Sequence, residues 1–412
     1  MEVCPIETLG ERIRKLRKQQ KLTLEALAGN ELTKGMLSLI ENNKANPSME
    51  SLSYIAERLG VEVTELLEEV STQELRALLE KADILYNTEF EIRTDEYTQL
   101  ITLVEPYIPK LTQGYESARL LEIYSRCLYY EKKKGWQAFS DRAATIYELM
   151  NIIPRRASIG IFRAFVKFTE HNYTQSLSTL LHERSEIEAR NAFIDPMTRL
   201  DLDYMEAVLH FAVGDSESAI RVMKSGIEFS RQEQVFYRIA HLYRLAAAHA
   251  MMNEDEEEYA YYLKKLTQYG DFTEDKEAIF FTKFAEVHYL NSYKKSYKEA
   301  QEQLDLFLDK DKYSFDYSPF INLEKGKSLF GLNEFEQALV ALEKVKIEDY
   351  IHHPFDLSIF YERDAYKALC YMELGNLIEA RRLAGLAMQN ISMMPRTPYK
   401  DFILETYELL TN

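Results

Sequence analysis

A unit of about 40 residues recurs from residue 172 onward and limits the folds open to this chain. In each copy, a turn containing Gly, Asn or Asp leads into a helical segment with a small residue in its first turns. Successive small residues are 43, 41, 40, 38 and 42 positions apart. Such a period predicts stacked helix pairs, in which neighbours bury a face that one pair cannot. The six small residues are Ser176, Ala219, Ala260, Ala300, Ala338 and Ala380.

Each pair has an apolar face too wide to be stable alone, and the small residue lets its two helices cross closely. The pattern resembles tetratricopeptide repeats, although the usual Trp and Leu-Gly pair are absent. Residues 76–157 are helical in pattern and rich in tyrosine, which predicts two or three more divergent repeats. The matching positions are Gly326, Phe335, Ala338 and Val345 in one copy and Gly375, Leu377, Ala380 and Ala387 in another.

Charge is divided unevenly along the 412 residues. Residues 1–44 hold eight Lys or Arg and six Glu, a net charge of +2, whereas the other 368 residues carry a net charge of −19. Phosphate contacts need clustered cations, so we expect any nucleic-acid contact in the N-terminal part of the chain.

This N-terminal part, residues 1–70, is called the head. Its pattern predicts five short helices, the second and third joined by a tight turn, which is typical of a helix-turn-helix module. In the third helix we expect Met36, Leu37 and Ile40 to face inward. The predicted caps of the second to fifth helices are Thr23, Thr33, Ser48 and Thr64.

The head resembles the Cro/repressor-type (Xre) helix-turn-helix family over some 55 residues. Leu24 departs from the Gln common in that family, and Asn43 replaces the usual Gly. The residues that match in order are Arg14-Lys15-Leu16-Arg17, Thr23, Leu27-Ala28, Thr33, Ser38, Ile40-Glu41, Asn46-Pro47-Ser48, Glu50, Leu52, Ile55-Ala56, Leu59 and Val61.

The resemblance implies that the third helix reads base edges in the major groove of DNA. Lys34 and Ser38 are best placed to reach base edges, and Gly35 allows close approach. The remaining expected DNA contacts, mostly to phosphates, are Arg14, Arg17, Thr33, Asn42, Asn43 and Lys44.

Stacked repeats curl into a superhelix whose concave groove is lined by the first helix of each pair. Tyr and Asn in such a groove suit an extended peptide, because Asn pairs with both backbone groups and Tyr gives contact area at low entropic cost. Packing between repeats is the alternative role for these tyrosines. The candidate peptide-binding residues are Arg126, Arg163, Tyr204, Tyr243, Tyr289, Asn291 and Asn322.

Enzyme signatures are absent from the sequence. It has no glycine-rich phosphate loop, no HExxH and no GxSxG, and its eight His are scattered. Cys4, Cys127 and Cys370 have no metal-binding or disulfide spacing. With no secretion signal and no run of 18 apolar residues, we expect a cytoplasmic protein that is not an enzyme and needs neither cofactor nor metal.

We therefore expect an all-α chain, with a helix-turn-helix head at residues 1–70 and a right-handed superhelical array of eight to nine tetratricopeptide-like helix pairs at 71–412. This architecture resembles the peptide-pheromone receptors of Gram-positive bacteria, the family of Rap, Rgg, PlcR, PrgX and NprR. Its length and repeat number are most similar to those of NprR. The resemblance implies a homodimeric or larger quorum-sensing regulator that binds operator DNA and a short imported signalling peptide.

Two other functions remain open at this point. The acidic repeats could sequester or dephosphorylate a response regulator, as the Rap relatives imply. Alternatively, the repeats could serve as a dimerisation scaffold that binds no ligand. The basic head favours a DNA-binding protein over a Rap-like one, and six repeats are more than dimerisation requires.

Overall fold

The structure is a computed structural model that describes residues 8–63, 66, 72–88, 93–190, 193–307 and 317–411. It divides into two compact units, Met1–Ile152 and Ile153–Asn412, which are considered separately. Every regular element within the described ranges is a helix, so the all-α prediction is confirmed. Thr64 and the predicted domain boundary at residues 70 and 71 lie outside these ranges.

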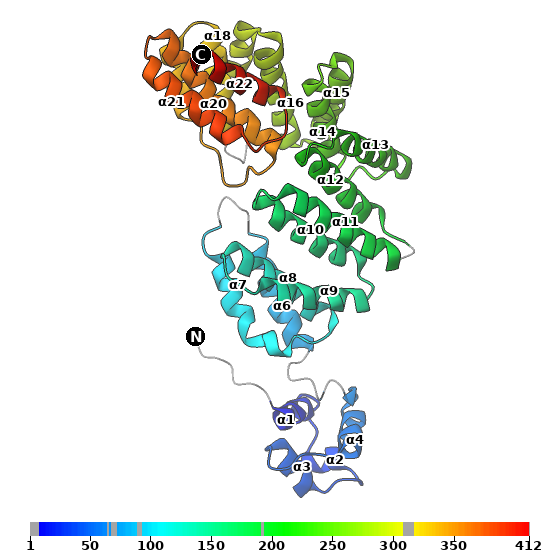
Figure 1. Cartoon of the computed structure of the whole chain (residues 1–412). Coiled ribbons are helices and arrows are strands. Elements are labelled where there is room, and N and C mark those ends of the chain that lie inside the picture. Colours follow the sequence, from blue (N-terminus) through cyan, green and yellow to red (C-terminus); the bar gives the residue numbers. More distant parts are fainter. Residues whose placement is uncertain are drawn as a thin grey trace. The chain divides into compact units, whose positions relative to one another are not determined.

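The head contains four described helices around one apolar core (Figure 1). Thr23, Thr33 and Ser48 begin three of them as predicted, since each side-chain oxygen accepts a backbone N–H of the following turn. Thr8 begins the first helix with a reciprocal capping box to Glu11. The helices are α1 (Leu9–Gln19), α2 (Leu24–Ala28), α3 (Lys34–Glu41) and α4 (Met49–Leu59).

The predicted inward face of α3 is partly wrong. Leu37 and Ile40 are buried, but Met36 is 48% exposed and Leu39 is 45% exposed. The short α3 crosses α1 so closely that a Cβ on Gly10 would lie 2.1 Å from the Ile40 carbonyl oxygen. One narrow stripe of α3 therefore meets the core, and the rest of the helix surface faces outward.

The remainder of the first unit is a group of antiparallel helices. Contacts join α6 to α7 and α8, and α8 to α9. These helices correspond to the divergent repeats expected upstream. They are α6 (Thr72–Tyr86), α7 (Glu96–Val104), the 3₁₀ helix η2 (Glu105–Lys110), α8 (Gly114–Tyr130) and α9 (Trp136–Leu149).

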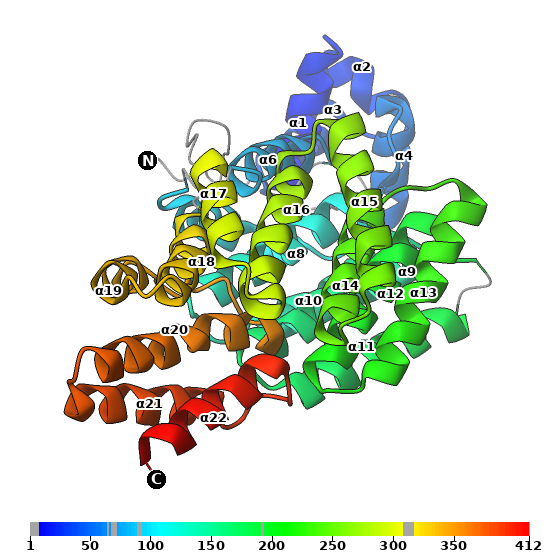
Figure 2. The same cartoon turned by 90° about the horizontal axis from the view of Figure 1, so that it is seen from above.

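The second unit is built from successive helix pairs, with each first helix contacting the first helix of the next pair (Figure 2). The first three pairs are α10 (Ile153–Thr169) with α11 (Tyr173–Arg190), α12 (Pro196–Ala212) with α13 (Ser216–Glu233), and α14 (Ile239–Met252) with α15 (Glu256–Thr273). The fourth pair is α16 (Lys276–Tyr289) with α17 (Tyr297–Phe307), and the π-helix η3 (Leu290–Lys294) connects these two helices. The others are α18 (Ser318–Gly331) with α19 (Phe335–Glu343) and α20 (Pro354–Glu373) with α21 (Leu377–Ile391), followed by α22 (Pro398–Thr411).

Five of the six predicted small residues are completely buried at the helix crossings, and one prediction is wrong. Ala260 is exposed, and the neighbouring Tyr259 is buried in its place. The Tyr259 hydroxyl donates a hydrogen bond to the Ala285 carbonyl, and its ring stacks on Tyr289 at 4.7 Å between centroids. In this repeat a large aromatic residue fills the space that a small one leaves elsewhere.

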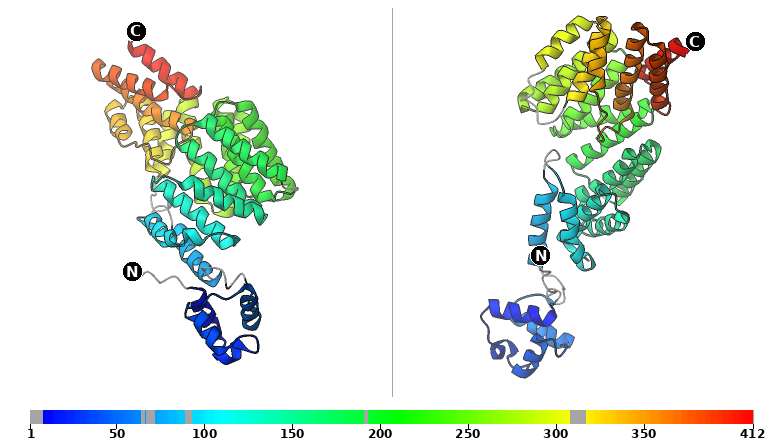
Figure 3. Two further views of the ribbon diagram at one scale, coloured as in Figure 1. Left: turned by 60° about the horizontal axis from the view of Figure 1, so that its bottom comes forward. Right: turned by 90° about the vertical axis from the view of Figure 1, so that its left-hand side faces the viewer.

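The segment before α20 packs against the first two pairs of the second unit. Tyr173 donates a hydrogen bond to the carbonyl of His352 at 2.8 Å, although 179 positions separate them. The neighbouring His353 donates from Nε2 to the carbonyl of Val208 at 3.2 Å. These contacts hold the start of α20 beside α11 and α12, within the C-terminal helices coloured green to red in Figure 3.

A buried polar network joins α16, η3, α18, α20 and α22. Its centre is Lys327, which has no exposed surface and lies 2.5 Å from Glu362 and 3.3 Å from Glu324. His288 places its ring nitrogens 2.7 Å from Glu324 and 2.8 Å from the Tyr399 hydroxyl. Burial alone would raise the pKa of Glu324, but Lys327, His288 and its hydrogen bonds lower it to about 2.

We expect Lys327→Met to destabilise the second unit, because it leaves Glu324 and Glu362 buried without their shared cation. Loss of one partner of a buried ion pair costs about 3–5 kcal/mol. Urea unfolding followed by circular dichroism measures the change. The control is Lys325→Met, a substitution on the same helix outside the network. Equal midpoints for the two variants would contradict this role for Lys327.

Two further features bear on the expectations from sequence. Cys127 and Cys370 are buried free thiols, and burial raises the pKa of each to about 12. Cys4 falls outside the described ranges. Across the residues that are described, no helix is both long enough and apolar enough to cross a membrane.

Candidate functional site

The outer surface of α3 carries the residues predicted to read DNA. Lys34 and Gly35 are exposed in its first turn, and Ser38 follows one turn later, partly exposed. A Cβ on Gly35 would meet only the Thr33 hydroxyl, at 3.9 Å. Lys34 pairs with Glu25 at 2.6 Å, but both side chains are more than half exposed, and such surface pairs are weak. Lys34 can therefore exchange this partner for another acceptor.

Arg17 has a structural role in the head, and its predicted DNA contact stays a prediction. Its guanidinium makes two parallel hydrogen bonds to Glu41, of 2.6 and 2.8 Å, and a third to the carbonyl of Leu22. Glu41 is 3% exposed and needs this cation. The ion pair fixes α1 against α3. Arg14, by contrast, is exposed on the outer surface of α1.

The polar residues at the two ends of α3 also contribute to the fold of the head. Thr33 is the cap of α3, and the Asn42 side chain donates to the Ser38 carbonyl at 2.7 Å. Asn43, which stands where the family usually has Gly, is in the left-handed conformation, with φ of 54°, and bonds to Thr8 and to the N–H of Gly10. Lys44 is exposed. Their predicted phosphate contacts stay predictions.

Exposed apolar residues on α3 were missed by the sequence reasoning, which assigned Met36 to the core. Met36 and Leu39 lie on the accessible part of the helix, one turn apart. Apolar side chains in a major groove contact the methyl group of thymine. Leu39 lies off the stripe of Leu37 and Ile40 that meets the core, so helical periodicity could have assigned it to the outer surface from sequence.

Two adjoining cavities lie in the second unit, with volumes of about 340 and 480 Å³. The smaller lies among α14, α16, α18 and the start of α20. The larger extends from α14 toward α12 and the segment before α22. Both volumes fall in the range of about 300–1,000 Å³ that is typical of ligand pockets. The residues shared by the two cavities are Arg244, Ala248, Phe281, Tyr350, Phe355 and Asp356.

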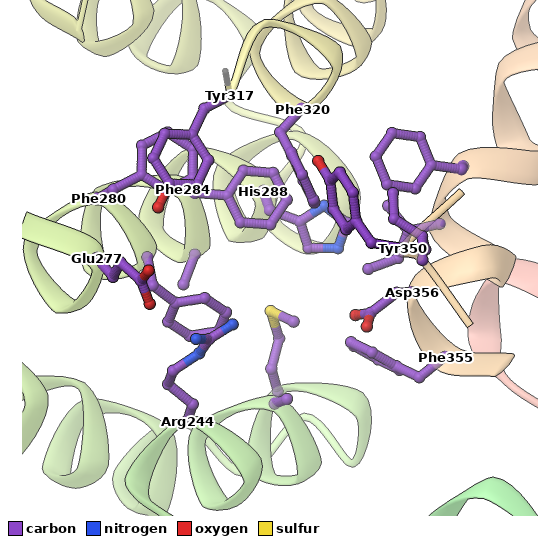
Figure 4. A pocket seen from close by; sticks show the side chains of 17 residues that line it. Arg244, Glu277, Phe280, Phe284, His288, Tyr317, Phe320, Tyr350, Phe355 and Asp356 are labelled. Carbon is purple, nitrogen blue, oxygen red and sulfur yellow. The ribbon is translucent and has the colours of Figure 1, made fainter. Parts of the chain in front are cut away.

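Aromatic rings form much of the wall of the smaller cavity (Figure 4). Phe284 meets Phe320 edge-on at 5.3 Å between centroids, and Phe320 meets Phe360 in the same way at 4.9 Å. The sequence IFFTKF places Phe280, Phe281 and Phe284 on one side of α16. His288 also lines this wall, so the buried network borders the cavity directly.

Two opposite charges enter the shared part of the cavities from different elements. Figure 4 shows Arg244 reaching in from α14 and Asp356 from the opposite side, at the start of α20. Asp356 is open to water through the cavity, but the surrounding walls limit its hydration and raise the pKa of its carboxyl. Burial likewise lowers the pKa of His241, in the larger cavity, to about 4.

Of the seven residues predicted to bind peptide, Tyr204 lines one of these cavities. Asn291 is completely buried in the network: its amide donates to Glu324 and its oxygen accepts from Ser328, so the predicted peptide contact is wrong. Asn322 is partly exposed on α18, outside both cavities. Four others have partners within the fold: Arg126 with Glu122, Arg163 with Glu183, Tyr243 with Tyr262 and Tyr289 with Tyr259.

The cavity residues Arg244 and Asp356 were missed from sequence. The stretch HHPFD carries a helix-start signal, because Pro354 stands at the first position of α20 and Asp356 in its first turn. That signal places a carboxylate at a helix start but does not indicate that α20 begins beside α12. Among the described residues, no cluster of three or more His, Cys, Asp or Glu could hold a metal ion.

Replacement of Asp356 by Asn should stabilise the chain at pH 7, because a carboxyl with a raised pKa is ionised there at a cost. The gain should shrink as the pH falls through that raised pKa, since the wild-type carboxyl then also becomes neutral. Thermal melting between pH 4 and 8 measures it. Asp271→Asn, on the exposed surface of α15, is the control. If the stability gained by Asp356→Asn does not vary with pH, the raised pKa of the Asp356 carboxyl is contradicted.

Comparison with known proteins identifies the class of the head. Residues 10–71 match the family model of a helix-turn-helix domain. An immunity repressor protein of Bacillus phage phi105 is 38% identical over 93 residues, which make up 21% of this chain and 64% of the repressor. The chain thus spans just under two thirds of that relative. Residues 10–71 are therefore a helix-turn-helix domain.

Solved structures similar to the larger part of the chain include PlcR and ComR. PlcR of Bacillus thuringiensis, in complex with the peptide PapR7 and DNA, is 19% identical with a TM-score of 0.36, covering 65% of this chain and 96% of PlcR. The competence regulator ComR of Streptococcus vestibularis, in complex with its signalling peptide XIP, is 18% identical with a TM-score of 0.38, covering 67% of this chain and 96% of ComR. The expected similarity to NprR in particular stays a prediction.

Proposed function

We propose that this chain is a cytoplasmic transcription regulator that binds operator DNA through α3 and a short peptide in the two cavities of its second unit. The observation that carries the proposal is the combination of a helix-turn-helix head with a ligand-sized cavity that contains charged residues. No part of the proposal requires catalysis. The peptide alters DNA binding, in line with the resemblance to peptide-pheromone receptors noted from the sequence.

The DNA-binding half of the proposal is supported by the outward surface of α3. This surface presents a cation, a hydroxyl and two apolar side chains: Lys34, Ser38, Met36 and Leu39. Together these groups can pair with guanine or adenine edges and contact thymine methyls. A single head presents little surface, so recognition by a homodimer at two half-sites is part of the proposal.

The cavities favour a ligand-binding unit over a scaffold that only dimerises. A scaffold gains nothing from charged groups without partners in an apolar cavity, because their desolvation costs free energy. A response regulator is too large to enter these volumes and would need an outer surface of the unit. Nothing in the geometry of the described residues favours that alternative.

The test is selection of random duplex DNA on the full-length chain, followed by mobility-shift titration at fixed salt. We expect an enriched site with two half-sites about one helical turn, or a multiple of it, apart. Lys34→Ala should weaken this site by about 1–3 kcal/mol through a lost base contact. Lys81→Ala, an exposed lysine of α6, should leave the affinity unchanged.

Two outcomes would contradict the DNA-binding half. One is a selection that enriches no sequence. The other is equal affinity of wild type and Lys34→Ala for an enriched site, which would assign Lys34 to the protein surface alone.

A further inference from the structure

Arg244 and Asp356 face the same cavity but are not paired: the charge of Arg244 lowers the pKa of the Asp356 carboxyl less than burial raises it. No ion pair joins them, and neither side chain has a hydrogen-bond or ion-pair partner anywhere in the described part of the chain. Most other enclosed charges of the second unit are paired; Glu183 and Lys327, for example, each contact two opposite charges. Glu277 is a third charge that lines the smaller cavity. The separation of Arg244 from Asp356 in one enclosed space is therefore unusual for this fold and needs a reason.

The position of Arg244 is fixed by stacking. Its guanidinium carbon lies 4.2 Å from the centroid of the Phe281 ring. Stacking on an aromatic face restrains the guanidinium plane and leaves its edge, which carries the N–H donors, free to bind. A guanidinium edge pairs best with a carboxylate, through two parallel hydrogen bonds.

The position of Asp356 is fixed by the helix that carries it. Pro354 stands at the first position of α20, and the His353 side chain accepts the N–H of Phe355, so the first turn is rigidly capped. The Asp356 carboxylate is then held at the cavity and can accept hydrogen bonds from an ammonium or guanidinium group.

An aromatic recess lies next to the two charges. Phe280, Phe284 and Phe320 line the smaller cavity, whose volume is about 340 Å³. The larger cavity continues from the charged pair toward α12, so an elongated ligand can pass through the shared region and occupy both. Charges on opposite sides of the passage also give the ligand a direction, because reversal would bring like charges together.

We propose that these cavities select a peptide of mixed charge, which places a large apolar side chain in the recess of Phe280, Phe284 and Phe320, a carboxylate on Arg244 and a cationic group on Asp356. This inference rests on the proposed function and specifies its ligand. The carboxylate and the cationic group of the peptide belong either to its side chains or to its two ends. The separation of Arg244 from Asp356 requires that the two groups project to opposite sides.

The test is affinity selection of a random heptapeptide library on the immobilised full-length chain, with retained peptides identified by mass spectrometry. One library has free ends and the other is acetylated and amidated, which distinguishes side-chain from terminal charges. We expect retained peptides to combine Phe, Leu or Ile with one acidic and one basic group. If Arg244 and Asp356 bind the charged ends of the peptide, the acetylated and amidated library should show no enrichment of charged groups.

Variants assign each preference to a residue. Arg244→Gln should weaken acidic peptides about tenfold or more and abolish their enrichment, while apolar enrichment persists. Asp356→Asn should abolish the basic preference in the same way. Arg244→Glu should reverse the charge preference at this position, so that basic peptides are retained in place of acidic ones. Arg221→Gln is the matched control, because Arg221 lies outside both cavities and bonds only to the nearby Ser218.

Three outcomes overturn the inference. Enrichment without charge preference, or identical preferences in wild type and in the Arg244 and Asp356 variants, refutes it but leaves a peptide-binding function standing. An Arg244→Glu chain that folds, as judged by its circular dichroism, yet retains acidic peptides also refutes it. If wild type retains no peptide from either library, the proposed peptide function fails together with the inference.

Discussion

The second unit depends on a buried ammonium group. Lys327 carries its charge into the interior of α18, where Glu324 and Glu362 are its partners. Glu324 in turn contacts His288 on α16 and Asn291 on η3, and His288 reaches Tyr399 on α22. Apolar contacts alone are tolerant of sliding, whereas charges and hydrogen bonds buried together have few satisfactory arrangements. We conclude that this network fixes the register of α16, α18 and α20, three of the helices that line the smaller cavity.

The network and the cavity share one wall. His288 presents one part of its ring to Glu324 and Tyr399 and also lines the cavity beside Phe284. A ligand that displaces this ring would disturb the partners of a buried carboxylate. A chain of direct contacts thus joins the wall of the cavity to Tyr399 on α22 through His288.

Much of the fold could be predicted from the sequence, because it depends on short-range patterns. Capping residues such as Thr33 and Ser48 act within one turn, and small residues such as Ala338 recur with the repeat period. The prediction that Ala260 is buried was wrong because the bulky Tyr259 is buried in its place. The Tyr259 hydroxyl hydrogen-bonds to Ala285 and its ring stacks on Tyr289, both in the next repeat. No local pattern indicates those partners.

The ligand site could be predicted much less well. Asn291 was predicted as a peptide contact from its residue type, but Ser328 and Glu324 saturate its amide. Arg17 was predicted as a DNA contact from its charge, but Glu41 binds it. Conversely, Arg244 and Asp356 become a site because the segment holding His352 and His353 packs against α11 and α12. Whether a polar side chain binds a ligand or stabilises the fold depends on long-range neighbours.

The central claim is that peptide in the cavities and DNA at the head are bound by one regulated chain. The most direct measurement is the affinity of the full-length chain for a selected DNA site, with and without a saturating selected peptide. The account predicts a change of at least fivefold in wild type, typical of allosteric coupling of about 1–3 kcal/mol, and the same change in Arg244→Gln only at about tenfold or higher peptide concentration. Equal DNA affinity of the wild-type chain in the presence and absence of bound peptide would contradict it.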